Sequence, residues 1–249
     1  MNNEKREIEY FFKDLNFNEE KHIYTVGDKK LPSVSKLIKN FHSQFDVYSN
    51  SLRVSKKLGV TQDKIIKQWD DIKEESCIRG TRVHNFAENY SFNRTLSPQC
   101  NQEKAVLNFW KTIPKYVSII STEIKMYHKV YNYAGTLDAL FFNKKDSTYH
   151  IIDYKTNKDI FKNFNGQTLF EPFNDLLDSP YSKYTLQLSF YKILLEQIGL
   201  KIASLKLVWL RQDSNFEIYD LKDVSSILIK YLDSKNDTIG NNTKNPIPI

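Results

Sequence analysis

Apolar residues recur at helical spacing through most of the first third of the chain, after a short extended start. Residues 22–26 alternate in the manner of a strand, and the glycine and aspartate that follow signal a turn. Pro32 and Ser33 predict the start of a helix that runs to about Phe41, with Ser33 as its N-cap. Further helices are predicted at residues 61–69 and onward, 81–90 and 103–110.

The middle of the chain changes to a period of two. Three β-rich runs cover residues 118–131, 134–143 and 148–156, and the polar residues 144–147 suit a hairpin turn between the last two. The remaining elements are a helix at 183–197 that ends near Gly199, strands at 204–211 and 216–219, and an amphipathic helix at 224–232. This order predicts an α/β fold with a central mixed sheet flanked by helices.

We expect one domain over residues 1–233. Its N-terminal helical part would extend to about residue 115, and its sheet core would occupy about 116–233. The tail at 234–249 is rich in Asn, Lys and Pro and poor in apolar residues, which predicts a mobile or loosely docked segment.

Composition narrows the class of protein. The 36 Lys and Arg residues outnumber the 30 Asp and Glu residues, so the net charge is +6, and aromatic residues make up 14% of the chain. Both features suit a nucleic-acid-binding protein, although solubility alone would explain such a charge. Cys77 and Cys100 are too few for a disulfide framework, and the sequence shows neither a membrane-spanning run nor a signal peptide. We therefore expect a cytoplasmic protein that is not secreted and has no membrane partner.

The predicted hairpin brings two carboxylates together. A turn centred between Lys145 and Asp146 pairs Asp138 with Asp153, so that their Cβ atoms would lie about 5 Å apart. Lys155 lies two residues after Asp153 and therefore points to the same face of the sheet. A register slip of one residue would separate the two carboxylates.

Two close carboxylates repel each other unless a cation neutralises them, and oxygen ligands at this density suit Mg²⁺ or Mn²⁺. Lys155 beside a metal-activated water could position that water or stabilise developing charge. Taken alone, the three residues are equally consistent with an ion triad on an exposed sheet face.

Four segments together resemble the PD-(D/E)xK nuclease superfamily, and in particular its RecB-type exonuclease branch. They are Gly135-Thr136-Leu137-Asp138, Ile151-Ile152-Asp153-Tyr154-Lys155-Thr156, Gln187-Leu188-Ser189-Phe190-Tyr191, and the upstream Gly80-Thr81-Arg82-Val83-His84. The segments at 23–25 and 31–35 also resemble the N-terminal part of phage and mitochondrial genome-maintenance exonucleases. The resemblance implies a restriction-endonuclease-like core elaborated by N-terminal helices.

The resemblance also implies roles for individual residues. Asp138 and Asp153 would bind the metal together with the backbone carbonyl of Tyr154, Lys155 would be the catalytic lysine, and His84 would be a further metal ligand. The second acidic residue is Asp153, where many members of the superfamily have Glu. Some relatives hold an iron–sulfur cluster with four cysteines, and a chain with two cysteines is expected to have no such cluster.

A second group of residues receives supporting or DNA-binding roles, each with a structural alternative. Gln187 and Tyr191 share a helix face and would reach the active site or a phosphate, although Tyr191 could instead pack on the sheet. Glu88 could bind a second metal or form a salt bridge, and Glu123 would join the site if its strand register allows. The remaining members are Arg79 and Arg82, which could contact phosphates, and Ser33, for which a helix cap is a sufficient explanation.

The expected function is Mg²⁺- or Mn²⁺-dependent hydrolysis of DNA from strand ends, in recombination, repair or phage DNA processing. The expected partners are single-stranded DNA or duplex ends, together with a recombination or replication protein. Three alternatives stay open: a structure- or sequence-specific endonuclease of the same superfamily, a catalytically silent nucleic-acid-binding subunit, and a metal protein that does not act on nucleic acid.

Overall fold

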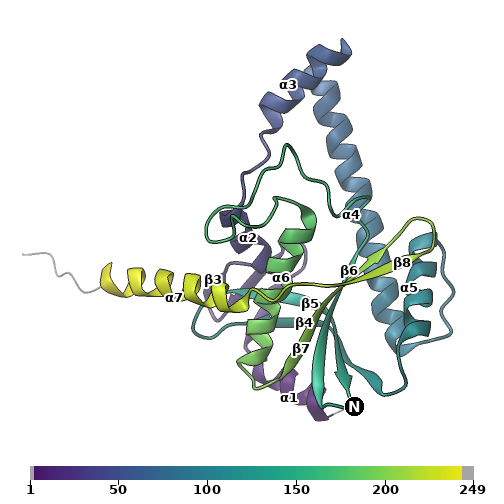
Figure 1. The fold of residues 1–249 in the computed structure, drawn as a ribbon, viewed down its shortest axis with the longest axis vertical. Helices are drawn as coiled ribbons and strands as arrows, with labels where there is room; N and C mark the ends of the chain where they lie inside the picture. Colours follow the sequence, from purple (N-terminus) through teal and green to yellow (C-terminus); the bar gives the residue numbers. More distant parts are fainter. Residues whose placement is uncertain (1–2, 243–249) are drawn as a thin grey trace, which may run out of the picture.

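The structure, a computed structural model, describes residues 3–242 and centres on a five-stranded sheet (Figure 1). Its strands lie in the order β4 (Val117–Tyr127), β5 (Ala134–Asn143), β6 (Thr148–Lys155), β7 (Ile202–Leu210) and β8 (Phe216–Asp220). The first three strands form an antiparallel meander, β6 and β7 are parallel, and β7 and β8 are antiparallel. The predicted α/β fold with a mixed central sheet is therefore confirmed.

Helices cover both faces of this sheet because alternate residues of its strands are apolar on each side. On one face α6 (Pro180–Glu196) makes the crossover that parallel strands require, and α7 (Ser225–Asn242) packs against α6. On the other face Val83 of α4 (Gln62–Phe92) and Phe109 of α5 (Asn101–Thr112) pack on Phe141 and Ile152 of the sheet. The two faces thus have separate apolar cores.

The N-terminal segment adds a small second sheet and three α-helices. Its elements are α1 (Asn3–Phe11), the antiparallel strands β1 (Leu15–Asn18), β2 (Ile23–Val26) and β3 (Lys29–Leu31), α2 (Val34–Ile38) with a following 3₁₀ turn (Lys39–Phe41), and α3 (Val47–Leu58). The predicted N-cap is confirmed, since the side chain of Ser33 accepts a hydrogen bond from the N–H of Lys36. The strand expected at residues 22–26 is β2, whereas β1 and β3 were not predicted.

The two helices expected at 61–69 and 81–90 are a single helix of 31 residues, α4. Gly80 lies inside this helix, where glycine is about 1 kcal/mol less favourable than alanine. The helix continues through it because its residues on either side pack against α3 and against the sheet. The N-terminal half of α4 packs against α3, which the sequence pattern did not predict, and this helix pair projects away from the sheet (Figure 1).

The last helix is longer than predicted. It continues beyond the expected end at Leu232 to Asn242, so that part of the expected tail at 234–249 is helical. Residues 243–249 of that tail lie outside the described residues. Along residues 3–242, no helix combines the length and apolar character needed to cross a bilayer.

Candidate metal centre

The β5–β6 hairpin has the predicted register. Ala139 pairs with Ile152, and the same register extended by one residue sets Asp138 opposite Asp153. The side chain of Asp138 is 13% exposed, and Asp153 as a whole is 1% exposed. The backbone N–H of Tyr154 donates a 2.7 Å hydrogen bond to Asp138 Oδ2. The two carboxylates are therefore neighbours in a nearly dry environment.

Two further ligand-type side chains converge on Asp138 from other elements. His84 comes from α4, and its Nδ1 lies 3.3 Å from Asp138 Oδ2. Glu123 comes from β4, and one ligand atom from each of His84, Glu123 and Asp138 lies within 4.8 Å of the others. The structure therefore brings together three of the residues that the sequence singled out, from three elements.

Glu123 reaches this position through an unusual backbone. Ile124 pairs with Leu137, so Glu123 lies opposite Asp138 in the middle of β4. Its φ of +48° is in the left-handed region, which costs a non-glycine residue on the order of 1–3 kcal/mol. Strained residues of this kind cluster at functional sites, so the backbone supports a role for Glu123 beyond packing.

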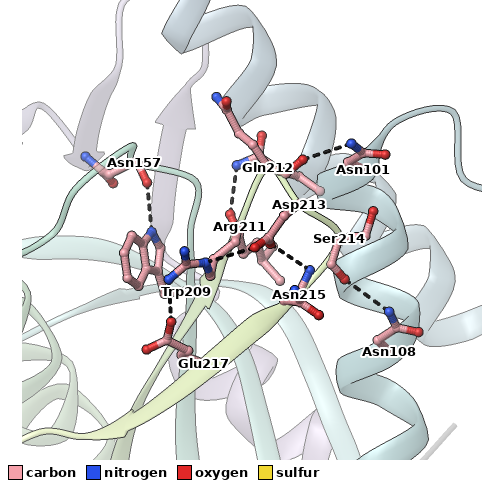
Figure 2. Close-up of polar contacts among 12 residues, drawn as sticks. Asn101, Asn108, Asn157, Trp209, Arg211, Gln212, Asp213, Ser214, Asn215 and Glu217 are labelled. Carbon is pink, nitrogen blue, oxygen red and sulfur yellow. Dashed lines mark hydrogen bonds and ion pairs between the residues drawn. The ribbon is translucent and has the colours of Figure 1, made fainter.

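Lys155 lies against Asp153, with 2.5 Å between its Nζ and Asp153 Oδ2. Below it is the ring of Tyr184, whose centre is 4.6 Å from the ammonium. The hydroxyl of Tyr184 donates to Asn157 Oδ1, and the backbone carbonyl of Asn157 accepts a bond from Trp209 Nε1 (Figure 2). Lys155 is thus held between a carboxylate and an aromatic face that is itself fixed.

Asp153 Oδ2 is buried and, among the described residues, has no hydrogen-bond partner. Its close partner is the Lys155 ammonium, which forms an ion pair with it at 2.5 Å. Lys155 compensates one negative charge of the two close carboxylates, and a divalent cation would compensate the charge that remains. The imidazole of His84 and the carboxylates of Glu123 and Asp138 could hold a metal ion, and Asp153 lies next to them on the hairpin.

The pKa values of the site residues are shifted in different directions by burial and by neighbouring charges. Burial alone would lower the pKa of His84, but the Asp138 carboxylate outweighs burial and raises this pKa to about 9. Burial, with repulsion from Asp138, raises the pKa of Glu123 to about 7 and that of Asp153 to about 6. The pKa of Asp138 is lowered, because His84 and Lys155 outweigh its burial.

These shifts favour a cation at the site. A negative charge on Asp138 makes the ionisation of its two acidic neighbours costly, and a divalent ion would remove that cost. Perturbed pKa values of this kind also concentrate at functional sites.

The G-x-x-D and Q-x-x-x-Y segments meet at one close contact. A Cβ on Gly135 would lie 2.6 Å from Cε1 of the Tyr191 ring and 3.1 Å from Cγ2 of Val34. Tyr191 is 3% exposed, and its hydroxyl accepts a 2.9 Å hydrogen bond from Gln187 Nε2. The ring therefore packs on the sheet, as the structural alternative for Tyr191 proposed. Burial, and then the charge of Asp153, raise the pKa of Tyr191.

The two predicted arginines differ in their ion pairs and hydrogen bonds. Arg82 Nε pairs at 3.2 Å with Glu103, whose side chain is 3% exposed, so this arginine joins α4 to α5. Arg79 Nη2 donates to Ser76 Oγ, but its Nε is buried without a hydrogen-bond partner among the described residues. Arg79 makes no ion pair among the described residues, whereas Arg82 does, so Arg79 is the better candidate to contact a phosphate.

Glu88 and Ser33 lie at the margins of the site. Glu88 lies one turn beyond His84, and its charge contributes to the raised pKa of Glu123, but it is outside the group of converging ligand atoms. Ser33 caps α2 and forms a bridge with Ala134, next to Gly135. Its observed contacts are structural.

Sequence reasoning missed the residues that hold the end of β6. Gln102 is 3% exposed, and its Nε2 donates to the carbonyls of Thr156 and Leu210. Tyr184 was missed as well, although its position three residues before Gln187 on the predicted helix places it on the same face. No sequence signal marks Gln102, because its partners are backbone carbonyls far along the chain.

The tip of the β7–β8 hairpin is fastened to α5. Asn101 Nδ2 donates to the carbonyl of Gln212, and Asn108 Nδ2 donates to that of Ser214 (Figure 2). These contacts anchor β7, the parallel neighbour of the strand that carries Asp153 and Lys155.

No protein-family model matches this chain, and no curated protein matches it either.

Proposed function

We propose that the protein is a Mg²⁺- or Mn²⁺-dependent DNA exonuclease with a restriction-endonuclease-like core, of the RecB-like branch of the PD-(D/E)xK superfamily. One observation carries the proposal: Asp138 lies opposite Asp153 on one hairpin, with Lys155 at 2.5 Å from Asp153 and His84 at 3.3 Å from Asp138. Binding of nucleic acid alone does not require a lysine beside two buried carboxylates.

His84, Glu123, Asp138 and Asp153 would hold the metal, together with the backbone carbonyl of Tyr154. When bound, such an ion polarises the phosphate and lowers the pKa of a bound water. Lys155 would orient the attacking water and stabilise the charge that develops on the phosphate oxygens, in a site where low exposure strengthens its field. Arg79, which makes no ion pair among the described residues, would neutralise a neighbouring phosphate with its guanidinium.

The projecting pair α3 and α4 supports action at ends rather than at internal sites (Figure 1). Because α4 also carries His84, the projecting pair is continuous with a helix that reaches the metal site, and it would guide a strand end toward that site. We expect the enzyme to act in the cytoplasm, in recombination, repair or phage DNA processing, together with a recombination or replication protein.

The test is digestion of end-labelled linear single strands and duplexes beside closed circles, with Mg²⁺, Mn²⁺ or EDTA. We expect metal-dependent loss from ends that spares circles, and a fall of about 10²–10³-fold or more in Lys155→Ala and Asp153→Asn. Lys206 and Asp220 form a matched ion pair at the same 2.5 Å on β7 and β8, so Lys206→Ala and Asp220→Asn should retain full activity.

The other outcomes separate the alternatives. Cleavage of closed circles would identify an endonuclease of the same superfamily. Metal-independent DNA binding without cleavage would identify a silent binding subunit, and absence of both would leave a metal protein that acts on something other than nucleic acid.

A further inference from the structure

A cavity of about 590 Å³ lies beside the projecting helix pair, and none of the residues of the metal centre lines it. Its walls come from the connector before α3, from α3 and α4, and from the loop between β6 and α6, which passes below α3 (Figure 1). Elements distant in sequence therefore enclose it, and the loop follows directly from the strand that ends at Lys155.

Aromatic rings line this cavity and are not covered. Phe45 is 61% exposed and makes an edge-to-face contact with Trp69 of α4, with ring centres 5.5 Å apart. Phe164 of the β6–α6 loop lines the same cavity and is also 61% exposed. Phe45 and Phe164 are thus exposed rings on two separate segments, and the half-buried Trp69 lies beside Phe45 on a third. Together they form an apolar surface suited to a flat ligand.

The charged groups of the cavity are suited to an anion. Arg53 and Lys162 are both exposed lining residues, and the Lys162 ammonium lies 5.1 Å from the centre of the Phe164 ring. The acidic lining residue, Asp46, is engaged as the N-cap of α3, where its carboxylate accepts a bond from the N–H of Ser49. The positive end of the α3 helix dipole therefore offsets the negative charge of Asp46.

We propose that this cavity binds an unpaired base of a single-stranded nucleic acid, which stacks on Trp69 and Phe45 while Arg53 and Lys162 contact the adjacent phosphates. Aromatic rings with interleaved cations are the combination that holds single strands without sequence preference, because every base has a π-face. In a duplex the base faces are covered, so the cavity selects unpaired nucleotides. The proposal rests on the proposed function for its substrate class.

The spacing to the metal site sets the length of strand required. Trp69 and His84 lie 15 residues apart on α4, which is about 22 Å along the helix axis. At about 3.4 Å per stacked nucleotide, roughly six nucleotides would span that distance. The cavity would thus hold the strand upstream or downstream of the bond at the metal site.

The experiment measures binding in EDTA, so that it is independent of hydrolysis. Oligo(dT) of about 12 nucleotides, roughly twice the span, is titrated while fluorescence anisotropy and tryptophan emission are recorded. We expect Trp69→Ala and Phe45→Ala each to weaken binding by about 5- to 150-fold, with Trp69→Phe restoring most of the affinity. Tyr10→Ala is the matched control, because Tyr10 is 70% exposed beside Lys13 on another part of the surface.

The charged residues give a second readout. The double variant Arg53→Ala/Lys162→Ala should reduce the slope of log affinity against log salt by about 1.4, at about 0.7 for each phosphate contact on a single strand. An abasic strand of equal length should bind wild type and Trp69→Ala equally. Equal affinity of wild type and Trp69→Ala for oligo(dT), or equal binding of a duplex, would overturn the proposal.

The outcomes also separate this inference from the proposed function. A protein that binds oligo(dT) through Trp69 but cuts nothing with Mg²⁺ or Mn²⁺ would support the cavity and refute the nuclease. A protein that cuts DNA while Trp69→Ala binds normally would support the nuclease and refute the cavity.

Discussion

Alanine substitution should have opposite effects at two glycines of the motif segments. At Gly135 an added Cβ would lie 2.6 Å from Tyr191 Cε1, about 1 Å inside the usual carbon–carbon contact distance. Neither Tyr191, which is 3% exposed, nor Val34, which is 1% exposed, has room to move. At Gly80 the new Cβ would meet only Thr156 Oγ1, at 3.6 Å, which is ordinary contact.

The magnitudes follow from these contacts. Overpacking at Gly135 costs about 1–3 kcal/mol, and the lower entropy of the unfolded chain with alanine returns about 0.4–1 kcal/mol. The net loss, about 1.3 kcal/mol at the middle of the two ranges, corresponds to a fall in Tm of roughly 3–5 °C for a chain of this size. Gly80→Ala, inside α4, should stabilise by about 0.5–1 kcal/mol because alanine is the better helix former.

Urea unfolding of wild type, Gly80→Ala and Gly135→Ala at one pH measures both effects, with equal m-values as the check that only stability has changed. A double-mutant cycle with Tyr191→Ala isolates the contact, since removal of the ring should abolish the penalty at Gly135. The packing of Tyr191 on Gly135 would be refuted if Gly135→Ala were as stable as wild type, or equally destabilised without the ring.

Three further predictions concern the metal centre. The folded-state pKa values of His84 and Glu123 are raised to about 9 and about 7, so the metal-free fold binds more protons than the unfolded chain. In EDTA its free energy of unfolding should therefore fall as pH rises from 6 to 9, by on the order of 3 kcal/mol from His84 alone, and a Tm that rose over this range would contradict the assignment. Mn²⁺ replaces those protons, so the Tm increase that it produces should be larger at pH 8.5 than at pH 6, and calorimetry should record proton release. Tyr184→Leu should lower kcat about tenfold with little change in KM, because Lys155 loses the ring at 4.6 Å, whereas Tyr184→Phe should retain most activity; equal effects of the two variants would exclude positioning by the ring.

The hairpin shows how much of the site the sequence can predict. A polar turn between two alternating runs fixes the register, and register alone places Asp138 opposite Asp153. Lys155 follows from the two-residue period of the strand. These inferences are local, since they depend on fewer than twenty consecutive residues.

Glu123 shows where prediction from sequence stops. Its strand could be recognised, but the direction of its side chain depends on a positive φ and on pairing with β5, and neither has a sequence signature at a glutamate. The continuity of α4 was missed for a related reason. Gly80 looks like a boundary in a local pattern, whereas the packing of the helix on both sides of it keeps the turns together.

The sequence by itself determined the α/β class, the paired carboxylates with their lysine, and the cap at Ser33, because each follows from backbone periodicity and short-range hydrogen bonding. Only the tertiary structure decided that His84 and Glu123 reach Asp138 and that Tyr191 packs on Gly135. It also decided that Tyr184 supports Lys155. Those contacts join residues far apart in the chain, and their distances depend on how whole helices pack against the sheet, which no local pattern of residues encodes.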